Sequence, residues 1–214
     1  MKIDFTDQRL VKYVRIFLVI FYAVGIAGFS IPSTFVLFQK LVPLNLIVST
    51  VILFLFHPKW DKKQVVIFAV LALSGFLVEM AGTGTGLIFG SYTYGSALGI
   101  KILSTPLLIG INWLVLVYCV HSLFPTGRQK WFYPFIGAAM LVVYDFVMEP
   151  VAIATDMWSW AGVTVPLKNY IAWYLVALIL FSVLRFSGIQ YRNAVAGWLS
   201  LIQFPFFLVL GLIL

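Results

Sequence analysis

Long apolar segments constrain the fold of this chain more than any other feature of its sequence. Seven segments have, or nearly have, the length of about 20 residues that a membrane-spanning helix needs: 12–31, 37–56, 64–81, 104–123, 131–149, 169–186 and 195–214. Apolar residues make up 63% of the 214 residues and charged residues only 10%, too much apolar surface for a water-soluble domain to bury. We therefore predict an all-α integral membrane protein with seven transmembrane helices in one bundle.

The basic residues fall mainly on one side of this predicted bundle. Eleven of the fourteen lie in the N-terminal segment or in the second, fourth and sixth connections, and the other three are Lys40, Lys101 and Lys168. Cytoplasmic loops carry the excess of lysine and arginine in membrane proteins. We therefore predict a cytoplasmic N-terminus, an outer C-terminus and residence in the inner (cytoplasmic) membrane of the cell. The net charge of +7 is interpreted as an orientation signal, and no nucleic-acid partner is expected.

Two of the predicted outer connections are long. Residues 82–103 are rich in glycine and aromatic residues, and residues 150–168 contain two tryptophans. Long connections in compact domains are usually functional or disordered, and the apolar composition here favours segments that fold back over the outer mouth of the bundle. Neither a strong internal repeat nor a second domain is evident, so residues 1–214 are predicted to form a single transmembrane domain.

Three acidic residues are predicted to lie in the outer half of the membrane. Glu79 and Asp145 follow the last lysine before them by 16 and 15 residues, which corresponds to about 22–24 Å of helix. Glu149 lies one turn beyond Asp145 on the same helix face. Carboxyl groups are costly in hydrocarbon and usually functional there, and burial favours their protonated form. All three are therefore candidate acids and bases; the alternative is a structural hydrogen bond or an ion pair with Lys101 or Lys168.

Aromatic residues accompany these acids in the sequence. Three pairs of rings lie in the long connections or near the start of the helices that follow them: Tyr92 and Tyr94, Trp158 and Trp160, and Trp113 and Trp173. A fourth acid, Asp156, lies in the same region. Because the faces of aromatic rings attract cations, acids among rings suit carbocation chemistry on an apolar substrate. The alternative is an aromatic belt at the membrane surface.

No grouping of residues indicates a metal or a cofactor. The single cysteine is Cys119, and His57 and His121 are expected near the cytoplasmic ends of helices. The run GTGTG has neither the preceding strand nor the spacing of a nucleotide-binding motif, and the last apolar segment lacks the lysine that a retinal Schiff base needs. We therefore expect no metal and no cofactor.

Two blocks of sequence resemble a known family. Residues 79–113 contain Glu79, then FGSYTY and LGIK, then a proline and a tryptophan. Residues 145–173 contain Asp145, a Glu-Pro pair, WSW, and then proline, asparagine and tryptophan. In this order the blocks resemble the carotenoid biosynthesis family that includes the carotenoid 1,2-hydratases and the bisanhydrobacterioruberin hydratases. The sequence departs from the pattern at Lys168, where a small or polar residue is expected.

The resemblance implies an enzyme that adds water to the C1=C2 double bond of an acyclic carotenoid end group. A carboxylic acid would protonate C2, rings and a carboxylate would stabilise the tertiary cation at C1, and water would attack C1. Asp145 is the leading candidate for the acid, with Glu79 or Glu149 holding the second proton or orienting the water. The residues expected to contact the substrate or the water are Tyr92, Tyr94, Trp113, Trp158, Trp160, Asn169, Thr83 and Lys101.

Other functions are compatible with the same residues. Glu79 and Asp145 would also suit the proton relay of a coupled transporter, although the inverted repeat common in transporters is not evident. Another carotenoid or prenyl-chain enzyme, such as an elongase or a cyclase, is a second alternative, without a visible Asp-rich magnesium motif. A non-catalytic membrane scaffold is a third. The expected partners are a carotenoid, water, the lipid bilayer and other enzymes of the carotenoid pathway.

Overall fold

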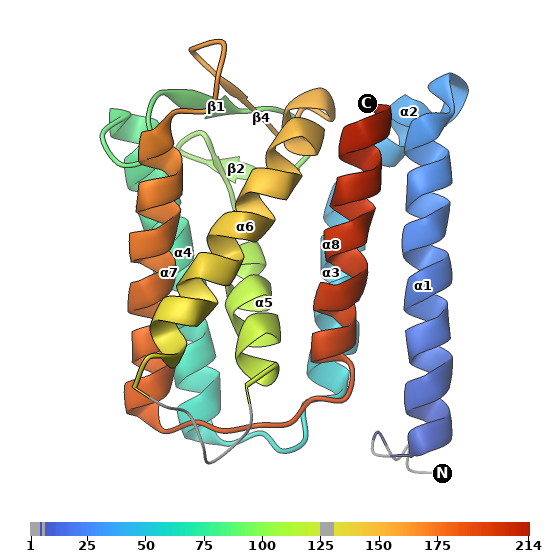
Figure 1. Ribbon diagram of the computed structural model, residues 1–214, viewed down its shortest axis with the longest axis vertical. Coiled ribbons are helices and arrows are strands. Elements are labelled where there is room, and N and C mark those ends of the chain that lie inside the picture. Colours follow the sequence, from blue (N-terminus) through green and yellow to red (C-terminus); the bar gives the residue numbers. More distant parts are fainter. Residues whose placement is uncertain (1–4, 6, 125–130) are drawn as a thin grey trace.

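The computed structural model describes residue 5 and residues 7–124 and 131–214, and its helices run side by side along one axis (Figure 1). The helices of the described residues are α1 (Gln8–Ser30), α2 (Pro32–Lys40), α3 (Val42–Leu55), α4 (Lys62–Thr85), α5 (Leu108–Ser122), α6 (Tyr133–Ala154), α7 (Leu167–Ser187) and α8 (Ala196–Ile213). The predicted all-α membrane fold is confirmed at this level. Lys2, Arg128 and Lys130, which contributed to the predicted orientation, lie outside the described residues.

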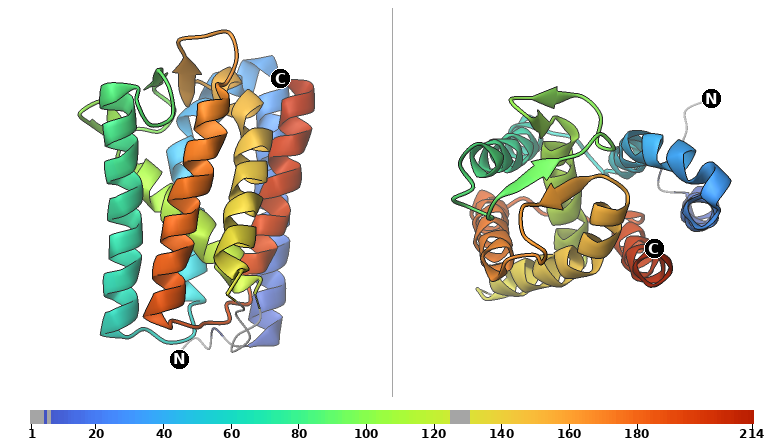
Figure 2. Two further views of the ribbon diagram at one scale, coloured as in Figure 1. Left: turned by 60° about the vertical axis from the view of Figure 1, so that its left-hand side comes forward. Right: turned by 90° about the horizontal axis from the view of Figure 1, so that it is seen from above.

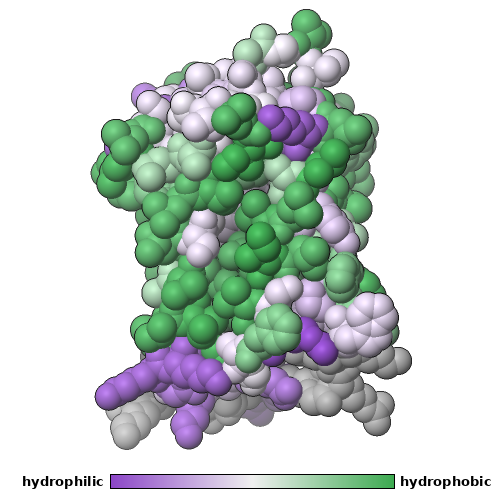
Figure 3. All heavy atoms as spheres, turned by 90° about the vertical axis from the view of Figure 1, so that its left-hand side faces the viewer, coloured by the Kyte–Doolittle hydropathy of each residue, from purple (hydrophilic) through white to green (hydrophobic). Residues whose placement is uncertain are grey.

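Five of these helices are long and apolar enough to cross a membrane: α1, α4, α6, α7 and α8. The bent pair α2 and α3 counts as a sixth if its two helices form one span. Many large apolar side chains on the outside of the bundle are exposed, and hydrophilic side chains gather at the end where the N-terminus lies (Figure 3). The chain is therefore a multi-pass membrane protein with five or six spans by length and composition.

The second predicted span, 37–56, is broken in the structure. Helix α2 ends at Lys40, and α3 begins at Val42 with its axis turned by 55°. Pro43 lies in the first turn of α3 and has no N–H to donate to the carbonyl of Gln39, so one continuous helix is disfavoured. The side chain of Gln39 instead donates to the carbonyl oxygen of Thr155 at 3.0 Å, which ties the bend to the end of α6.

Helix α5 is short and lies at the centre of the bundle. It has 15 residues, most of them buried, and it contacts α3, α4, α6, α7 and α8. Glycines permit its close approach to α4, since a Cβ atom at Gly110 would lie 2.4 Å from the carbonyl oxygen of Ala72. Figure 1 shows that α5 occupies only the half of the bundle nearer the N-terminus. The fourth predicted span, 104–123, is thus helical only from Leu108 onward.

The two long connections cover the other end of the bundle. Helix α4 continues to Thr85 and ends at Gly86, which has a φ of 64°, and α6 continues through Pro150 to Ala154. The connections are therefore residues 86–107 and 155–166, and we call them together the cap. Strand β1 (Tyr92–Tyr94) pairs antiparallel with β4 (Trp158–Trp160), so that Tyr92 lies opposite Trp160 and Tyr94 opposite Trp158. The views in Figure 2 show this ribbon lying across the ends of the helices.

A short hairpin completes the cap. Strand β2 (Lys101–Ile102) pairs antiparallel with β3 (Thr105–Pro106), which leads directly into α5. Alternate residues of a strand point to opposite faces, and in β1 both tyrosines are buried while Thr93 is exposed. The alternation in β1 and β4 therefore directs the rings down into the bundle.

Asp156 fastens the two halves of the cap together. Its Oδ2 accepts hydrogen bonds from the Ser96 backbone N–H at 2.8 Å and from the Ser96 hydroxyl at 2.7 Å. These bonds lower the pKa of the Asp156 carboxyl group. A Cβ atom at Gly95 would lie 2.1 Å from the carbonyl oxygen of Asp156, so this approach requires glycine. Asp156 thus fixes the cap and is exposed, whereas Glu79, Asp145 and Glu149 are buried.

The end of the bundle opposite the cap is closed by a buried polar network. The Nδ1 atom of His57 lies 2.7 Å from the hydroxyl of Tyr118, to which the amide of Asn193 donates at 3.0 Å. The rings of Tyr118 and Tyr191 are stacked at 4.2 Å. This network holds the C-terminal end of α5 in place.

Candidate functional site

Glu79 is surrounded by hydrogen-bond donors from the cap and from α5. Its Oε2 accepts from the hydroxyls of Tyr92 and Tyr94 at 2.5 and 2.7 Å, and its Oε1 accepts from the indole Nε1 of Trp113 at 2.8 Å. The side chain is 3% exposed. Gly75 of α4 lets Trp113 reach this position, since a Cβ atom there would lie 2.6 Å from the Trp113 Cβ. The three donors match the carboxylate form of Glu79, which only accepts hydrogen bonds.

Burial keeps the two tyrosines in their donor form. Burial, followed by the nearby Glu79 carboxylate, raises the pKa of Tyr92 and of Tyr94 above the usual value. Both hydroxyls therefore stay protonated at neutral pH and remain able to donate to Glu79.

Glu149 occupies a similar position on α6 beneath β4. Its Oε2 accepts from the indole nitrogens of Trp158 and Trp160 at 2.9 and 3.1 Å. Its Oε1 has one long contact, 3.4 Å from the Nδ2 atom of Asn169 on α7. Glu149 thus has one oxygen held by two donors and one oxygen that is largely free to interact with another molecule.

Asp145 lies one turn away from Glu149 and is fully buried. Its Oδ2 accepts from the same Asn169 Nδ2 at 2.8 Å, while its Oδ1 has no hydrogen-bond partner within the part of the chain that the structure describes. Asn169 therefore connects the two carboxyl groups of α6. Since an unpaired buried acceptor costs about 1–3 kcal/mol, Asp145 is held at a cost in stability.

A small cavity of about 20 Å³ separates Glu79 from Glu149. This volume is sufficient for about one water molecule. Asn169 and Ile109 also line this cavity, which we call the acid cavity, together with the rings of Phe89, Tyr92, Tyr94, Trp158, Trp160 and Trp173. Asp145 is not among the lining residues and lies behind Asn169.

The other two predicted site residues support the cap. Thr83 contacts the hydroxyl of Thr105 at 2.9 Å and bonds to the backbone of its own helix, and it does not line the acid cavity. The ammonium group of Lys101 donates to the carbonyl oxygen of Tyr94 at 2.6 Å. Among the described residues, no cation is hydrogen-bonded to Glu79, Asp145 or Glu149.

The structure adds three residues to the candidate site: Phe89, Ile109 and Trp173. Trp173 packs against Trp113 with ring centroids 4.3 Å apart. Its position near the start of a helix, next to a long connection, could have marked it in the sequence as a site residue. Phe89 lies in the same aromatic segment as Tyr92. Nothing in the sequence distinguishes Ile109 from the other aliphatic residues of its apolar segment.

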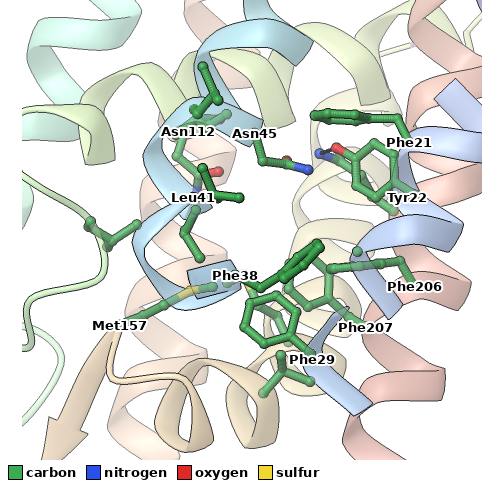
Figure 4. Close-up of a pocket in the computed structure, with 18 of the residues that line it drawn as sticks. Phe21, Tyr22, Phe29, Phe38, Leu41, Asn45, Asn112, Met157, Phe206 and Phe207 are labelled. Atoms are coloured by element: carbon green, nitrogen blue, oxygen red, sulfur yellow. Dashed lines mark hydrogen bonds between the residues drawn. The ribbon is translucent and has the colours of Figure 1, made fainter. Parts of the chain in front are cut away.

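A larger cavity of about 250 Å³ adjoins the site and is shown in Figure 4. Its lining comes from α1, α2, α3, α5, α6, α8 and the cap, and it is mostly apolar. We call it the apolar cavity. Ile109 and Trp158 line both the apolar cavity and the acid cavity, so the two spaces are neighbours.

Fold and site together define a helical membrane protein with paired carboxyl groups in a ring-lined cavity beneath a folded cap. The pattern of the carotenoid biosynthesis protein family matches residues 41–214. The chain belongs to this family, which confirms the resemblance seen in the two sequence blocks.

One relative has a more specific name. The chain is 28% identical over 140 residues to the bisanhydrobacterioruberin hydratase of Haloarcula japonica, and the match covers 58% of this chain and 46% of that protein. The chain therefore spans about half the length of this relative. No solved structure matches the chain.

Proposed function

We propose that this protein is a carotenoid 1,2-hydratase, which adds water to the C1=C2 double bond of an acyclic carotenoid end group without a cofactor. The observation that carries the proposal is that Glu79 and Glu149 face one water-sized cavity lined by aromatic rings. Membership of the carotenoid biosynthesis family and the name of the hydratase relative support it. The expected partners are the carotenoid, water, the bilayer and other carotenoid enzymes in the same membrane.

The two glutamates suit different roles. Glu79 has three donors around its two oxygens and acts as the carboxylate that stabilises positive charge. Glu149 has its Oε1 largely free at the acid cavity and acts as the acid. The ring faces of the site add to the stabilisation of a cation.

The proposed reaction conserves atoms and charge. The O–H bond of the Glu149 carboxyl group breaks, and its proton forms a C–H bond at C2 with the electron pair of the double bond. The resulting tertiary cation at C1 is attacked by the oxygen of water. The water then loses a proton to the Glu149 carboxylate, which restores the acid. The net change is the addition of one water molecule.

Asp145, the leading acid from the sequence, has a less direct place in this proposal. It contacts Asn169, which in turn contacts Glu149, and it does not line the acid cavity. We propose that Asp145 positions Asn169 and through it Glu149. The prediction that Asp145 itself gives the proton is kept as the competing assignment.

We also propose seven spans, with α2 and α3 as one broken span and α5 as a short one. The part of the bundle above α5 would be filled by the cap. The two chain ends lie at opposite ends of the bundle (Figure 1), as an odd number of spans requires. With the basic residues inside, the N-terminus is cytoplasmic, the cap and C-terminus are outside, and the protein is a single domain of the inner membrane.

Pigment analysis tests the proposed reaction. The protein is expressed in a bacterium that accumulates lycopene or γ-carotene, and the extracted pigments are analysed by chromatography and mass spectrometry. We expect a more polar product that is heavier by one water, and growth in H₂¹⁸O should place the heavy oxygen in the new hydroxyl. Unchanged pigment with folded protein in the membrane would refute hydration of these two substrates.

Amide variants distinguish the two acids of α6. If Glu149 gives the proton, Glu149→Gln should lower the rate by about 100-fold or more, and Asp145→Asn should cause a smaller loss. The reverse order would return the acid role to Asp145. Asp7→Asn is the matched control, because it makes the same carboxyl-to-amide change at an exposed residue before α1, where Asn can still cap the helix.

A further inference from the structure

The apolar cavity has the chemistry of a hydrocarbon-binding site. No charged side chain lines it among the described residues. Figure 4 shows the amides of Asn45 and Asn112 on one side of the cavity, with the rings of Phe29, Phe38 and Phe206 on the other. Its volume of about 250 Å³ is below the range of pockets that enclose a whole drug-sized ligand, which is about 300–1,000 Å³. It therefore suits one end of a long apolar chain.

The apolar cavity lies next to the acid cavity. Ile109 of α5 and Trp158 of β4 line both cavities, and the indole nitrogen of Trp158 donates to Glu149 at 2.9 Å. A chain end that lies in the apolar cavity and passes between these two side chains would meet the free oxygen of Glu149.

The apolar cavity also reaches the outer surface of the helix bundle. Two of its lining residues, Val24 of α1 and Leu44 of α3, are 52% and 50% exposed. Both lie on helices whose outer faces are apolar, so the opening between α1 and α3 faces lipid. A ligand dissolved in the bilayer could enter from the side without crossing the cap, and the rest of a long chain could stay in the lipid.

One wall of the apolar cavity comes from a part of the chain that the family pattern does not cover. The family match begins at residue 41, whereas α1 and α2 end before it. These two helices contribute rings and a glycine to the lining, among them Tyr22, Gly25, Phe29 and Phe38. Gly25 is a narrow point, since a Cβ atom there would lie 3.1 Å from the ring of Phe206.

We propose that the apolar cavity receives the isoprenoid end of the substrate sideways from the bilayer, and that its α1–α2 wall decides which end groups fit. This inference rests on the proposed hydratase function for the identity of the chain. It assigns substrate selection to Gly25 and Phe38, which lie outside the acid site and outside the region that the family pattern matches.

Pigment retention tests the proposal independently of turnover. Glu149→Gln protein is purified in detergent from cells that accumulate lycopene, and the bound pigment per protein is measured after gel filtration. Adding Gly25→Leu should fill the cavity and lower the retained pigment at least five-fold. Gly84→Leu is the matched control, because nothing lies within 4 Å of a Cβ atom at Gly84, and it should retain the pigment. Equal retention with Gly25→Leu would overturn the proposal.

A second variant enlarges the cavity instead of filling it. In otherwise unchanged protein, Phe38→Ala should shift the ratio of ζ-carotene to lycopene conversion at least five-fold, because these two pigments differ in the saturation of the acyclic end that the wall contacts. If Phe38→Ala alters neither retention nor this ratio in folded protein, the α1–α2 wall does not select the substrate. If the wild type forms no hydrated product while Gly25→Leu still lowers retention, the binding site stands and the hydratase function fails.

Discussion

Trp113 links helix α5 directly to Glu79 of α4. Its indole N–H is the hydrogen-bond donor to Oε1, and Phe would remove this donor together with part of the buried ring. Trp113→Phe should therefore destabilise the protein by at least the roughly 1–3 kcal/mol that an unpaired buried acceptor costs, and should lower hydration. Thermal unfolding in detergent measures the first effect. Trp131→Phe, at a ring that is 71% exposed, should change neither.

Asp156 gives the cap a pH dependence that can be measured. Hydrogen bonds from Ser96 lower the pKa of Asp156 in the folded protein. The Asp156 carboxylate therefore stabilises the protein above the ordinary aspartate pKa of about 3.9. This stabilisation is lost as the pH falls through the lower pKa of the folded protein. Wild type should have a higher unfolding temperature than Asp156→Asn at pH 6, and the difference should shrink towards pH 3. A difference that stays constant over this range would contradict the role of Asp156.

Individual acids could be predicted from the sequence, but their partners could not. Glu79, Asp145 and Glu149 are conspicuous because a carboxyl group inside an apolar segment is costly. The tyrosines and tryptophans were expected to present ring faces to a cation, whereas the structure also uses their O–H and N–H groups as donors to Glu79 and Glu149. Where the O–H and N–H groups of these rings point depends on how the cap folds. The residue type alone does not determine that fold.

At the scale of elements, apolar length predicts where helices lie but not how they end or break. Helix α4 continues to Thr85 through two glycines, and the second predicted span is split by the bend before Pro43. The pairing of β1 with β4 joins segments more than 60 residues apart. Alternating rings in each segment were visible in the sequence, but a short strand has no local feature that identifies its partner.

The close packing of α5 on α4 sets the geometry of the site and gives a prediction at the scale of elements. Gly110→Ala would place a Cβ atom 2.4 Å from the carbonyl oxygen of Ala72, so α5 must shift and move Trp113 away from Glu79. The overpacking should cost about 1–3 kcal/mol and reduce hydration several-fold. Gly84→Ala, which meets open space, should leave both properties unchanged. Equal activity and melting temperature in the two variants would show that this contact does not position the site.

At the scale of the whole molecule, the proposed seven spans place the cap and the inner loops on opposite sides of the membrane. The exposed Thr93 in β1 and the exposed Lys59 before α4 mark the two sides. In a Cys119→Ala background, Thr93→Cys should react with a membrane-impermeant maleimide in spheroplasts, whereas Lys59→Cys should react only after the membrane is permeabilised. Cys119 is buried, so its removal only eliminates background labelling. If Lys59→Cys alone is labelled before permeabilisation, the orientation is the reverse of the proposed one. If both cysteines are labelled, the cap and the loop before α4 lie on one side of the membrane, which excludes the seven-span topology.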